Sequence, residues 1–396
     1  MNSLAPSASA VGHLAGVSNE WSILLAACSP MPPEKKAQRL QDLLQRSADW
    51  EILFDLAEKH GVQPLLHRAL LPIGNAVPHE HMLTLKQNDQ TNLLKSMLVS
   101  RELIRIVDRF TTLGLHVVPY KGPALAEALY GDVALRRSGD IDLLILPRDF
   151  PRACEAARDL GYTPHLNLPL RQERAYLKSG YECAFDSAAG RNLLELQWAI
   201  QPRFYAIDFD VEDLFHRAVT VNVAGHAMKT LSLDDLFLVL SAHAAKHVWG
   251  KLIWLSDLAL LITNPTLKWD WIGDHARELG IVRIVRVTMN LAHDLLEAPI
   301  PVAAETHVPQ DLESVALATR IQDKIVSSAE PDVESISYFR LMLRLRERTG
   351  DRMRFLQRLV FTPGPGEWNA IRLPAPLSPL YRLVRLSRLA ARLIRR

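Results

Sequence analysis

The chain has 396 residues, of which 48% are hydrophobic and 23% charged, and its formal net charge is +2. These values are typical of a globular protein of two or three domains, and the balanced charge gives no general attraction to nucleic acid. The three cysteines (Cys28, Cys154 and Cys183) fit a reducing compartment and offer no zinc framework. The N-terminus lacks the features of a secretory signal, and no stretch is long enough to cross a bilayer. We therefore expect a cytoplasmic protein.

In chain order, the apolar patterns and the breaks at proline and glycine predict five parts. They are a flexible tail (1–18), an N-terminal helical region (19–110), a mixed α/β core (111–232), a C-terminal helical domain (233–365), and a proline-containing linker with a basic amphipathic helix (366–396). In the first helical region, an amphipathic helix begins at Trp50 and ends at Gly61. A second, long helix is predicted over 84–110, leading into the first strand.

The core is predicted to open with a short apolar strand at 117–119, followed by Lys121-Gly122 and a helix rich in Ala and Leu. Pro123 suits the first turn of that helix. A strand, a glycine turn and a helix N-terminus together form an anion site, because free backbone N–H groups point at the ligand. Lys121 and, further on, Arg136 add positive charge. The segment therefore predicts a phosphate-binding site.

Asp140 and Asp142 begin the next apolar run, which reads as a buried strand. Alternate residues of a strand point to the same face, so the two carboxylates project together while Ile141 points into the core. This arrangement makes sense if a divalent cation lies between them, and hard oxygen ligands suit Mg²⁺. The alternative is that this common tripeptide is only a solvated strand end.

With these residues, segment 115–162 resembles the uncharacterised nucleotidyltransferase family of the DNA polymerase β-like nucleotidyltransferase superfamily. The residues that match the family pattern are Lys121-Gly122, Leu129-Tyr130, Arg136 and Asp140-Ile-Asp-Leu-Leu144. The wider superfamily usually has Gly-Ser in place of Lys121-Gly122. The resemblance implies an α+β fold, with a mixed-sheet nucleotidyltransferase core (111–232) flanked by helical regions. It also implies a nucleoside triphosphate as co-substrate and Mg²⁺ (or Mn²⁺) as cofactor.

A third carboxylate is expected on a later strand, and Glu195 is the candidate. The strand predicted over 193–199 alternates apolar and polar residues, so Glu195 and Gln197 share a face. The family has His before the Trp, and this chain has Gln197, which cannot act as a proton shuttle. The alternative function is therefore a catalytically weak nucleotide-binding accessory or antitoxin-like protein. Glu182 and Asp186, on the neighbouring predicted strand, are interpreted as structural.

The resemblance implies transfer of a nucleoside monophosphate to a hydroxyl acceptor on a small molecule, sugar, peptide or protein. Asp140, Asp142 and Glu195 would be the metal ligands and catalytic residues. Glu195 or a metal-bound water would take the acceptor's proton, and pyrophosphate would leave in line. Lys121 and Arg136 would stabilise the negative charge of the triphosphate.

The C-terminal helical domain is predicted to begin with a helix capped at Ser232-Leu-Asp-Asp235. The resembled family carries a helix of this type, and the matching residues are His243, Lys246, His247, Trp249 and Asp257. Lys246 or His247 is therefore expected to meet the nucleotide or the acceptor, and core packing is the alternative. Histidines four apart can bind zinc, but H-A-A-K-H lacks the glutamate of a metalloprotease helix.

Residues 380–396 carry six arginines and no acidic residue. On a helical wheel, one side gathers Leu383, Val384, Leu386, Leu389, Ala390, Leu393 and Ile394, and the other gathers Arg385, Arg388, Arg392, Arg395 and Arg396. Such a helix is compatible with an anionic membrane surface or an acidic partner. The favoured alternative is a helix packed on the body of the protein with its arginine face in solvent.

Overall fold

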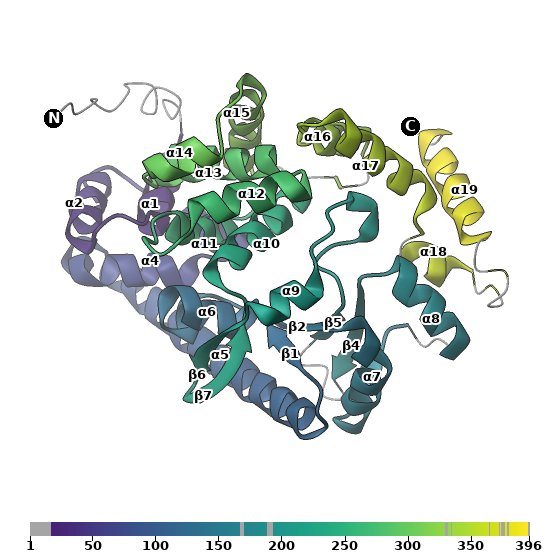
Figure 1. The fold of residues 1–396 in the computed structure, drawn as a ribbon. Coiled ribbons are helices and arrows are strands. Elements are labelled where there is room, and N and C mark those ends of the chain that lie inside the picture. The colour runs from purple at the N-terminus through teal and green to yellow at the C-terminus, as the bar shows by residue number, and fades with distance from the viewer. Residues whose placement is uncertain are drawn as a thin grey trace.

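The computed structural model describes residues 17–166, 170–187, 193–328, 332–333, 335–363, 365–371, 373, 377 and 380–394. It has an α+β fold in which a mixed sheet is flanked by helices from both ends of the chain (Figure 1). The predicted fold class is therefore confirmed. Most of the predicted tail, residues 1–16, lies outside the described residues.

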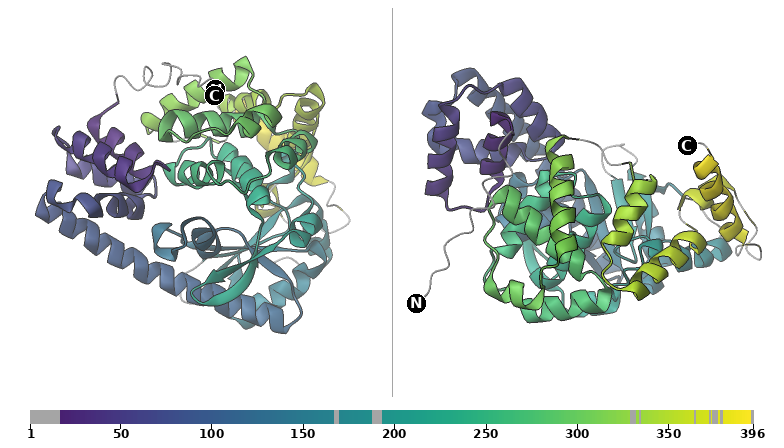
Figure 2. Two further views of the ribbon diagram at one scale, coloured as in Figure 1. Left: turned by 60° about the vertical axis from the view of Figure 1, so that its left-hand side comes forward. Right: turned by 90° about the horizontal axis from the view of Figure 1, so that it is seen from above.

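The helices before the sheet form the N-terminal region. They are α1 (Asn19–Cys28), α2 (Pro33–Leu44), α3 (Trp50–Lys59), α4 (Gln63–Leu70), the 3-10 segment η1 (Leu71–Ala76) and α5 (His79–Thr112). Asp49 caps α3 by accepting two backbone N–H bonds. Gly61 then takes a left-handed φ of 71°, which ends the predicted amphipathic helix. The long helix α5 begins before the predicted position and runs from the N-terminal helices along the sheet (Figure 2).

The sheet contains β1 (Val117–Pro119), β2 (Asp140–Ile145), β3 (Tyr162–Pro164), β4 (Glu182–Ser187) and β5 (Leu193–Gln197), in the order β1-β2-β5-β4-β3. Between the strands lie α6 (Gly122–Tyr130), η2 (Val133–Leu135), η3 (Pro147–Asp149), α7 (Phe150–Asp159) and α8 (Leu170–Ser179). Strands β2 and β5 are parallel, whereas the other neighbours are antiparallel. The sheet is therefore mixed, as the resemblance implied.

The two faces of β2 have different surroundings. Ile141, Leu143 and Ile145 are buried in one cluster with residues of α5 and α7. Alternate residues of a strand point to opposite faces, so Asp140 and Asp142 project from the other face of the sheet. The strand is thus held by its odd-numbered apolar residues, and its acidic residues remain free to form a site.

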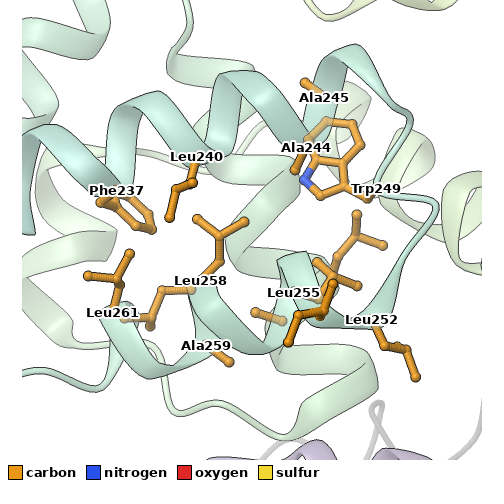
Figure 3. Close-up of a cluster of buried hydrophobic side chains, with 14 of the residues drawn as sticks. Phe237, Leu240, Ala244, Ala245, Trp249, Leu252, Leu255, Leu258, Ala259 and Leu261 are labelled. Carbon is orange, nitrogen blue, oxygen red and sulfur yellow. The ribbon is translucent and has the colours of Figure 1, made fainter. Parts of the chain in front are cut away.

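The chain next forms η4 (Arg203–Tyr205), α9 (Val211–His216), the hairpin β6 (Val219–Val223) and β7 (His226–Thr230), and then α10 (Leu233–Lys246), α11 (Leu252–Ile262), α12 (Trp269–Leu279), α13 (Val282–Leu296), α14 (Val302–His307) and α15 (Leu312–Val326). Ser232 caps α10 through its hydroxyl, at the predicted position. Phe237 and Leu240 of α10 pack against Leu258 of α11 (Figure 3). Trp249 is fully buried in the same core.

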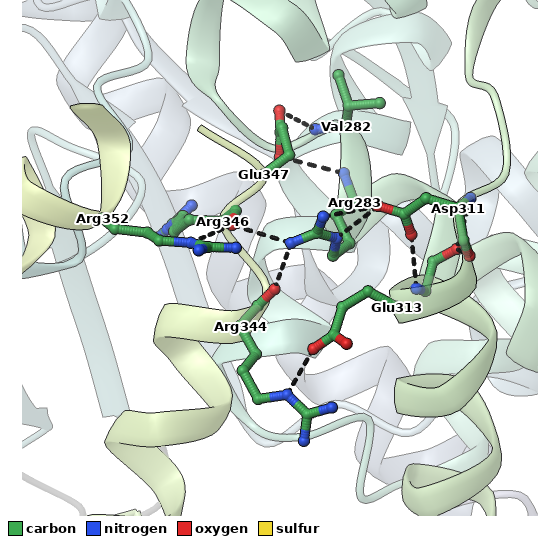
Figure 4. Close-up of polar contacts among 9 residues, drawn as sticks. Val282, Arg283, Asp311, Glu313, Arg344, Arg346, Glu347 and Arg352 are labelled. Atoms are coloured by element: carbon green, nitrogen blue, oxygen red, sulfur yellow. Dashed lines mark hydrogen bonds and ion pairs between the residues drawn. The ribbon is translucent and has the colours of Figure 1, made fainter. Parts of the chain in front are cut away.

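The last elements are α16 (Ile336–Arg344), α17 (Thr349–Phe361), α18 (Pro365–Ala370) and α19 (Tyr381–Ile394). The guanidinium of Arg283, at the start of α13, bonds to Asp311 at 2.7 and 2.9 Å and to the carbonyl oxygens of Arg344 and Arg346 at 2.7 and 3.0 Å (Figure 4). These hydrogen bonds of Arg283 connect α13 to the start of α15 and to the segment between α16 and α17.

The predicted arginine face of the C-terminal helix is partly wrong. Arg385 is only 8% exposed, and its guanidinium donates to the carbonyl of Leu359 at 2.6 Å and to Glu367 at 3.2 Å. Leu383, predicted on the apolar side, is 61% exposed. The helix therefore packs with Arg385 facing Glu367 of α18 and with Leu383 in solvent. Within the described part of the chain, no helix has the length and apolar character that crossing a membrane requires.

Candidate active site

Carboxylates gather on the face of the sheet where β2, β5 and β4 lie side by side. Asp142 lies directly opposite Glu195 on the parallel strand β5. Gln197, two residues further on, lies opposite Glu182 on the antiparallel strand β4. Residues opposite one another on neighbouring strands share a face and lie in contact. Sheet pairing therefore brings three acidic side chains and an amide together, and Glu182, interpreted as structural from the sequence, is one of them.

Lys121 and Gly122 start helix α6 beside these carboxylates. Gly122 has a φ of 58°, and a Cβ there would lie 3.5 Å from the backbone oxygen of Asp140. The distance is an ordinary van der Waals contact, so the left-handed φ, which is costly for residues with a side chain, explains the glycine in this turn. The Lys121 ammonium lies 2.9 Å from Oδ1 of Asp142, and the two side chains are only 16% and 9% exposed. Lys121 is therefore the buried counter-charge of Asp142.

The Gln197 side chain connects the carboxylates. Its Nε2 lies 2.8 Å from Glu195, 3.1 Å from Asp142 and 3.3 Å from Glu182. Its Oε1 accepts a hydrogen bond from the hydroxyl of Tyr120, which is buried. Because ionised carboxylates only accept hydrogen bonds, the amide nitrogen of Gln197 faces the acids and its oxygen is left to accept from Tyr120. No sequence pattern indicated this role for Tyr120, whose partner lies 77 residues away.

The electrostatics of this cluster keep one proton bound near neutral pH. Burial, together with the neighbouring Asp142 and Glu182, raises the pKa of Glu195 to about 8. Burial also raises the pKa of Glu182. Burial opposes ionisation of Asp142 too, but the Lys121 ammonium and hydrogen bonds outweigh it and hold that pKa below its ordinary value. Asp142 is therefore ionised while Glu195 carries the proton and hydrogen-bonds to it.

Asp140 stands apart from the other acids, at the exposed start of β2. Burial and the charge of Asp142 raise its pKa, so it lies within the electrostatic reach of the cluster. Among the described residues, no group of three His, Cys, Asp or Glu side chains is arranged to hold a metal ion. The chemistry of these side chains nevertheless fits a hard divalent cation, because carboxylate oxygens are the ligands that such ions prefer. The negative charges raise the pKa of Asp140 and Glu195, and Lys121 is the cation that compensates Asp142.

Arg136 is engaged in an ion pair with α11. Its Nε lies 2.9 and 3.2 Å from the two carboxylate oxygens of Asp257, and the Tyr130 hydroxyl donates to the same carboxylate at 2.8 Å. Arg136 and Asp257 are 8% and 1% exposed. In this arrangement Arg136 ties the sheet to the C-terminal helices, and its contact with a triphosphate stays a prediction.

The last turn of α10 borders the acidic cluster. The Lys246 ammonium lies 5.7 Å from the centre of the Tyr181 ring, and the Tyr181 hydroxyl donates to Glu182. Burial and the charge of Lys121 lower the pKa of Lys246, whereas Glu182, Glu195 and Asp142 act in the opposite direction. Lys246 is therefore within the electrostatic reach of all three acids, and its contact with the nucleotide or the acceptor stays a prediction.

The histidines of the same turn form an aromatic group with Trp254. The His243 and His247 ring centres are 4.8 Å apart, and they lie 5.3 and 5.2 Å from the Trp254 ring. Burial lowers the pKa of both histidines, that of His247 to about 3. Both rings are therefore neutral and packed at physiological pH.

A mixed sheet that presents adjacent carboxylates beside a glycine-initiated helix is the arrangement of a nucleotidyltransferase domain. The model of the family described as "Uncharacterised nucleotidyltransferase" matches residues 46–297, more than half of the chain, so the chain belongs to this family. The match includes the N-terminal helices from α3 onward, the whole sheet and helices α10 to α13. Searches of curated proteins and of solved structures gave no match.

Proposed function

We propose that this protein transfers a nucleoside monophosphate from a nucleoside triphosphate to a hydroxyl acceptor and releases pyrophosphate. The observation that carries the proposal is the contact of Asp142 with Glu195 beside the Lys121-Gly122 turn. Family membership supports nucleotidyl transfer in general. The adjacent acids, the helix start and the buried lysine supply the charge and positioning that this chemistry requires.

In the proposed reaction, the ionised form of Glu195 takes the proton of the acceptor hydroxyl as the hydroxyl oxygen forms a bond to the α-phosphorus. A divalent cation held by the acids would favour this ionised form, because it would offset the charges of Asp142 and Glu182 that raise the pKa of Glu195. The bond between the α-phosphorus and the bridging oxygen breaks, and pyrophosphate leaves with the electron pair. Glu195 is the candidate base because it lies against Asp142 and is oriented by the Gln197 amide. Gln197 itself cannot transfer protons, so its role is to position the carboxylates.

Asp140, Asp142 and Glu195 are the residues that would hold Mg²⁺ or Mn²⁺. A bound ion would neutralise charge on the triphosphate and on the leaving pyrophosphate. The backbone N–H groups at the start of α6 and the Lys121 ammonium would then contact phosphate oxygens. Without nucleotide, the charge of Lys121 is balanced by Asp142. On triphosphate binding, a phosphate oxygen would replace Asp142 as the partner of the lysine.

A second candidate function is nucleotide binding without transfer. The separation of Asp140 from the other acids and the Gln at position 197 favour it. In that case the protein would act as an accessory or antitoxin-like protein whose nucleotide is a regulatory ligand.

The test is incubation with α-labelled triphosphates, Mg²⁺ or Mn²⁺ and host extract. We expect label to move to an acceptor with the native chain and with Asp186→Asn, but not with Asp142→Asn. Asp186 is the matched control, because it is an acid of the same sheet with a 66% exposed side chain, distant from the cluster in register. Triphosphate binding without any transfer would favour the second function, and equal transfer by all three chains would exclude the assigned site.

A further inference from the structure

A cavity of about 360 Å³ lies where the ends of α3 and α15 meet the loop that follows α10. This volume is within the range of small-molecule pockets. The cavity is separate from the acidic cluster, and none of the acids assigned above lines it. The proposed reaction gives it no role so far.

The charge of the cavity wall has one sign. Lys59, Lys251 and Lys324 line it, and no acidic side chain does so among the described residues. Lys59 donates to the backbone oxygen of Ser328 at 2.8 Å, which is an uncharged partner. Positive charges gathered around a concave surface focus their field and attract anions. The wall therefore favours an anionic ligand.

The histidines of the wall do not contribute to this charge. Burial, with the charges of Lys59 and Lys251, lowers the pKa of His60 to about 4. Burial and the neighbouring lysines lower the pKa of His247 to about 3. The lysine ammonium groups therefore act alone as the cationic part of the wall.

Most of the remaining wall is apolar, and the backbone turn that carries part of it is fixed by tertiary contacts. Trp254, Val248 and Ile325 supply it. Val248 and Trp249 have φ values of 54° and 49°, which are costly for residues with side chains. Trp249 secures this strained turn, because its ring is fully buried and its Nε1 donates to Thr288 at 3.0 Å. Such strain is kept at ligand sites where the surrounding structure fixes it.

One turn of α10 connects the cavity to the acidic cluster. His247 lines the cavity, and the preceding Lys246 lies over Tyr181, the residue that bonds to Glu182. A ligand in the cavity would therefore contact the same helix turn that borders the acids. One helix turn rises only about 5 Å, so the cavity and the acidic cluster lie on either side of a short piece of chain. The nucleotide's phosphates are assigned to the Lys121-Gly122 turn, which leaves the cavity for the other substrate.

We propose, building on the proposed transferase function, that this cavity binds the hydroxyl acceptor and that the acceptor is a small molecule carrying a phosphate group. The phosphate would lie among Lys59, Lys251 and Lys324, with its apolar or ring portion against Trp254. The acceptor hydroxyl would then point past the last turn of α10 toward Glu195.

The probe is pyridoxal 5′-phosphate, whose aldehyde forms an imine with a lysine amine and is fixed by borohydride reduction. Peptide mass spectrometry of the full chain then locates the label. We expect Lys251 and Lys324 to be labelled at least threefold more than Lys229, an exposed lysine of β7. Inorganic phosphate should protect them, and pyridoxal, which lacks the phosphate, should label all exposed lysines alike.

Two variants complete the test. Lys251→Gln with Lys324→Gln should weaken non-covalent binding of pyridoxal 5′-phosphate about tenfold and leave binding of a fluorescent triphosphate analogue unchanged, and Lys229→Gln should change neither. Equal labelling of Lys251 and Lys324 by pyridoxal and by pyridoxal 5′-phosphate would overturn the proposal. So would a double variant that has a lower melting temperature but binds pyridoxal 5′-phosphate as tightly as the native chain. Protection of the cavity lysines by a non-hydrolysable triphosphate with Mg²⁺, but not by phosphate, would assign the cavity to the nucleotide. Failure of the transferase proposal is recognised separately, by triphosphate binding without any transfer of label from the native chain.

Discussion

Lys121 and Asp142 form a largely buried ion pair that joins the residue before α6 to the third residue of β2, with 2.9 Å between the lysine nitrogen and Oδ1. The pair sets the protonation of the whole cluster, because the ammonium keeps Asp142 ionised while the proton stays on Glu195. An acidic site in this chain is therefore partly neutralised before any substrate arrives.

Stability in the absence of metal is expected to fall as the pH rises. The pKa of Glu195 is about 8 in the folded chain against 4.5 for an ordinary glutamate, so the folded state binds this proton more tightly. Its stabilising effect is complete below about pH 4.5 and is lost as the pH rises toward 8. One pKa unit corresponds to about 1.4 kcal/mol, and the loss should exceed that. Thermal unfolding in chelator from pH 5 to 9 should show a smaller decline for Glu195→Gln than for the native chain.

The Gln197 amide is predicted to position the carboxylates. Gln197→Leu removes the shared donor while keeping a similar volume, and we expect transfer activity to fall about 10- to 100-fold, as for other groups that orient metal ligands. Tyr120→Phe removes only the bond that orients Gln197 and should have a smaller effect. The measurement is the rate of pyrophosphate release at saturating triphosphate. Unchanged rates for Gln197→Leu would show that the acids keep their places without it.

The buried ion pair between Arg136 and Asp257 is predicted to contribute to the stability of the folded chain. Asp257→Ala leaves the Arg136 guanidinium buried without its partner, which should cost about 3–5 kcal/mol of unfolding free energy. The comparison is Asp159→Ala, which breaks an ion pair with Arg109 in which the side chains are 60% and 39% exposed and should cost less than about 1 kcal/mol. Urea unfolding gives both values, and similar costs would contradict the assignment.

Divalent ions are predicted to stabilise the native chain. An ion that binds only the folded state at 100 times its dissociation constant adds about 2.7 kcal/mol, so Mn²⁺ should raise the melting temperature by several degrees and chelator should reverse the rise. Asp142→Asn should abolish the effect, and Asp186→Asn should preserve it. An equal rise in both variants would place ion binding elsewhere.

The C-terminal helix offers a test of the membrane or acidic-partner hypothesis. Leu383 and Leu386 are 61% and 37% exposed beside the exposed Arg382, so the outward face is both apolar and basic. If this face meets an anionic surface, the chain should sediment with vesicles containing phosphatidylserine but not with phosphatidylcholine vesicles. Leu383→Ser should reduce the bound fraction, whereas binding to neither vesicle would leave an acidic protein as the partner to seek.

The parts of the site that depend on local pattern were predictable from the sequence. The alternation at Asp140 and Asp142 and the glycine turn at Gly122 are properties of adjacent residues. Glu195 was predicted because the resemblance implied a third carboxylate on a later strand, and the alternation of that strand placed Glu195 on the same face as Gln197. Glu182 could have been found by assuming that the two consecutive strands pair as a hairpin, since the antiparallel register sets it opposite Gln197.

Other features depend on contacts between distant segments. Asp257 lies 121 residues from Arg136, and Tyr120 lies 77 residues from Gln197, and no periodicity encodes such pairs. Arg385 contacts Glu367 of α18 and the carbonyl of Leu359, and a helical wheel of the C-terminal segment contains neither partner. The basic cavity was equally invisible, because Lys59, Lys251 and Lys324 come from three separate helical segments.

The parallel pairing of β2 with β5 has a consequence for when the acidic cluster forms during synthesis. Between these strands the chain must first pass through α7, β3, α8 and β4, and closing so long a loop is slow relative to forming local helices. A nascent chain that has emerged only as far as Asp142 already has its lysine counter-ion, but Glu195 is still within or near the ribosome. The acidic cluster should therefore be complete only late in synthesis, after β5 has paired with β2 on one side and β4 on the other.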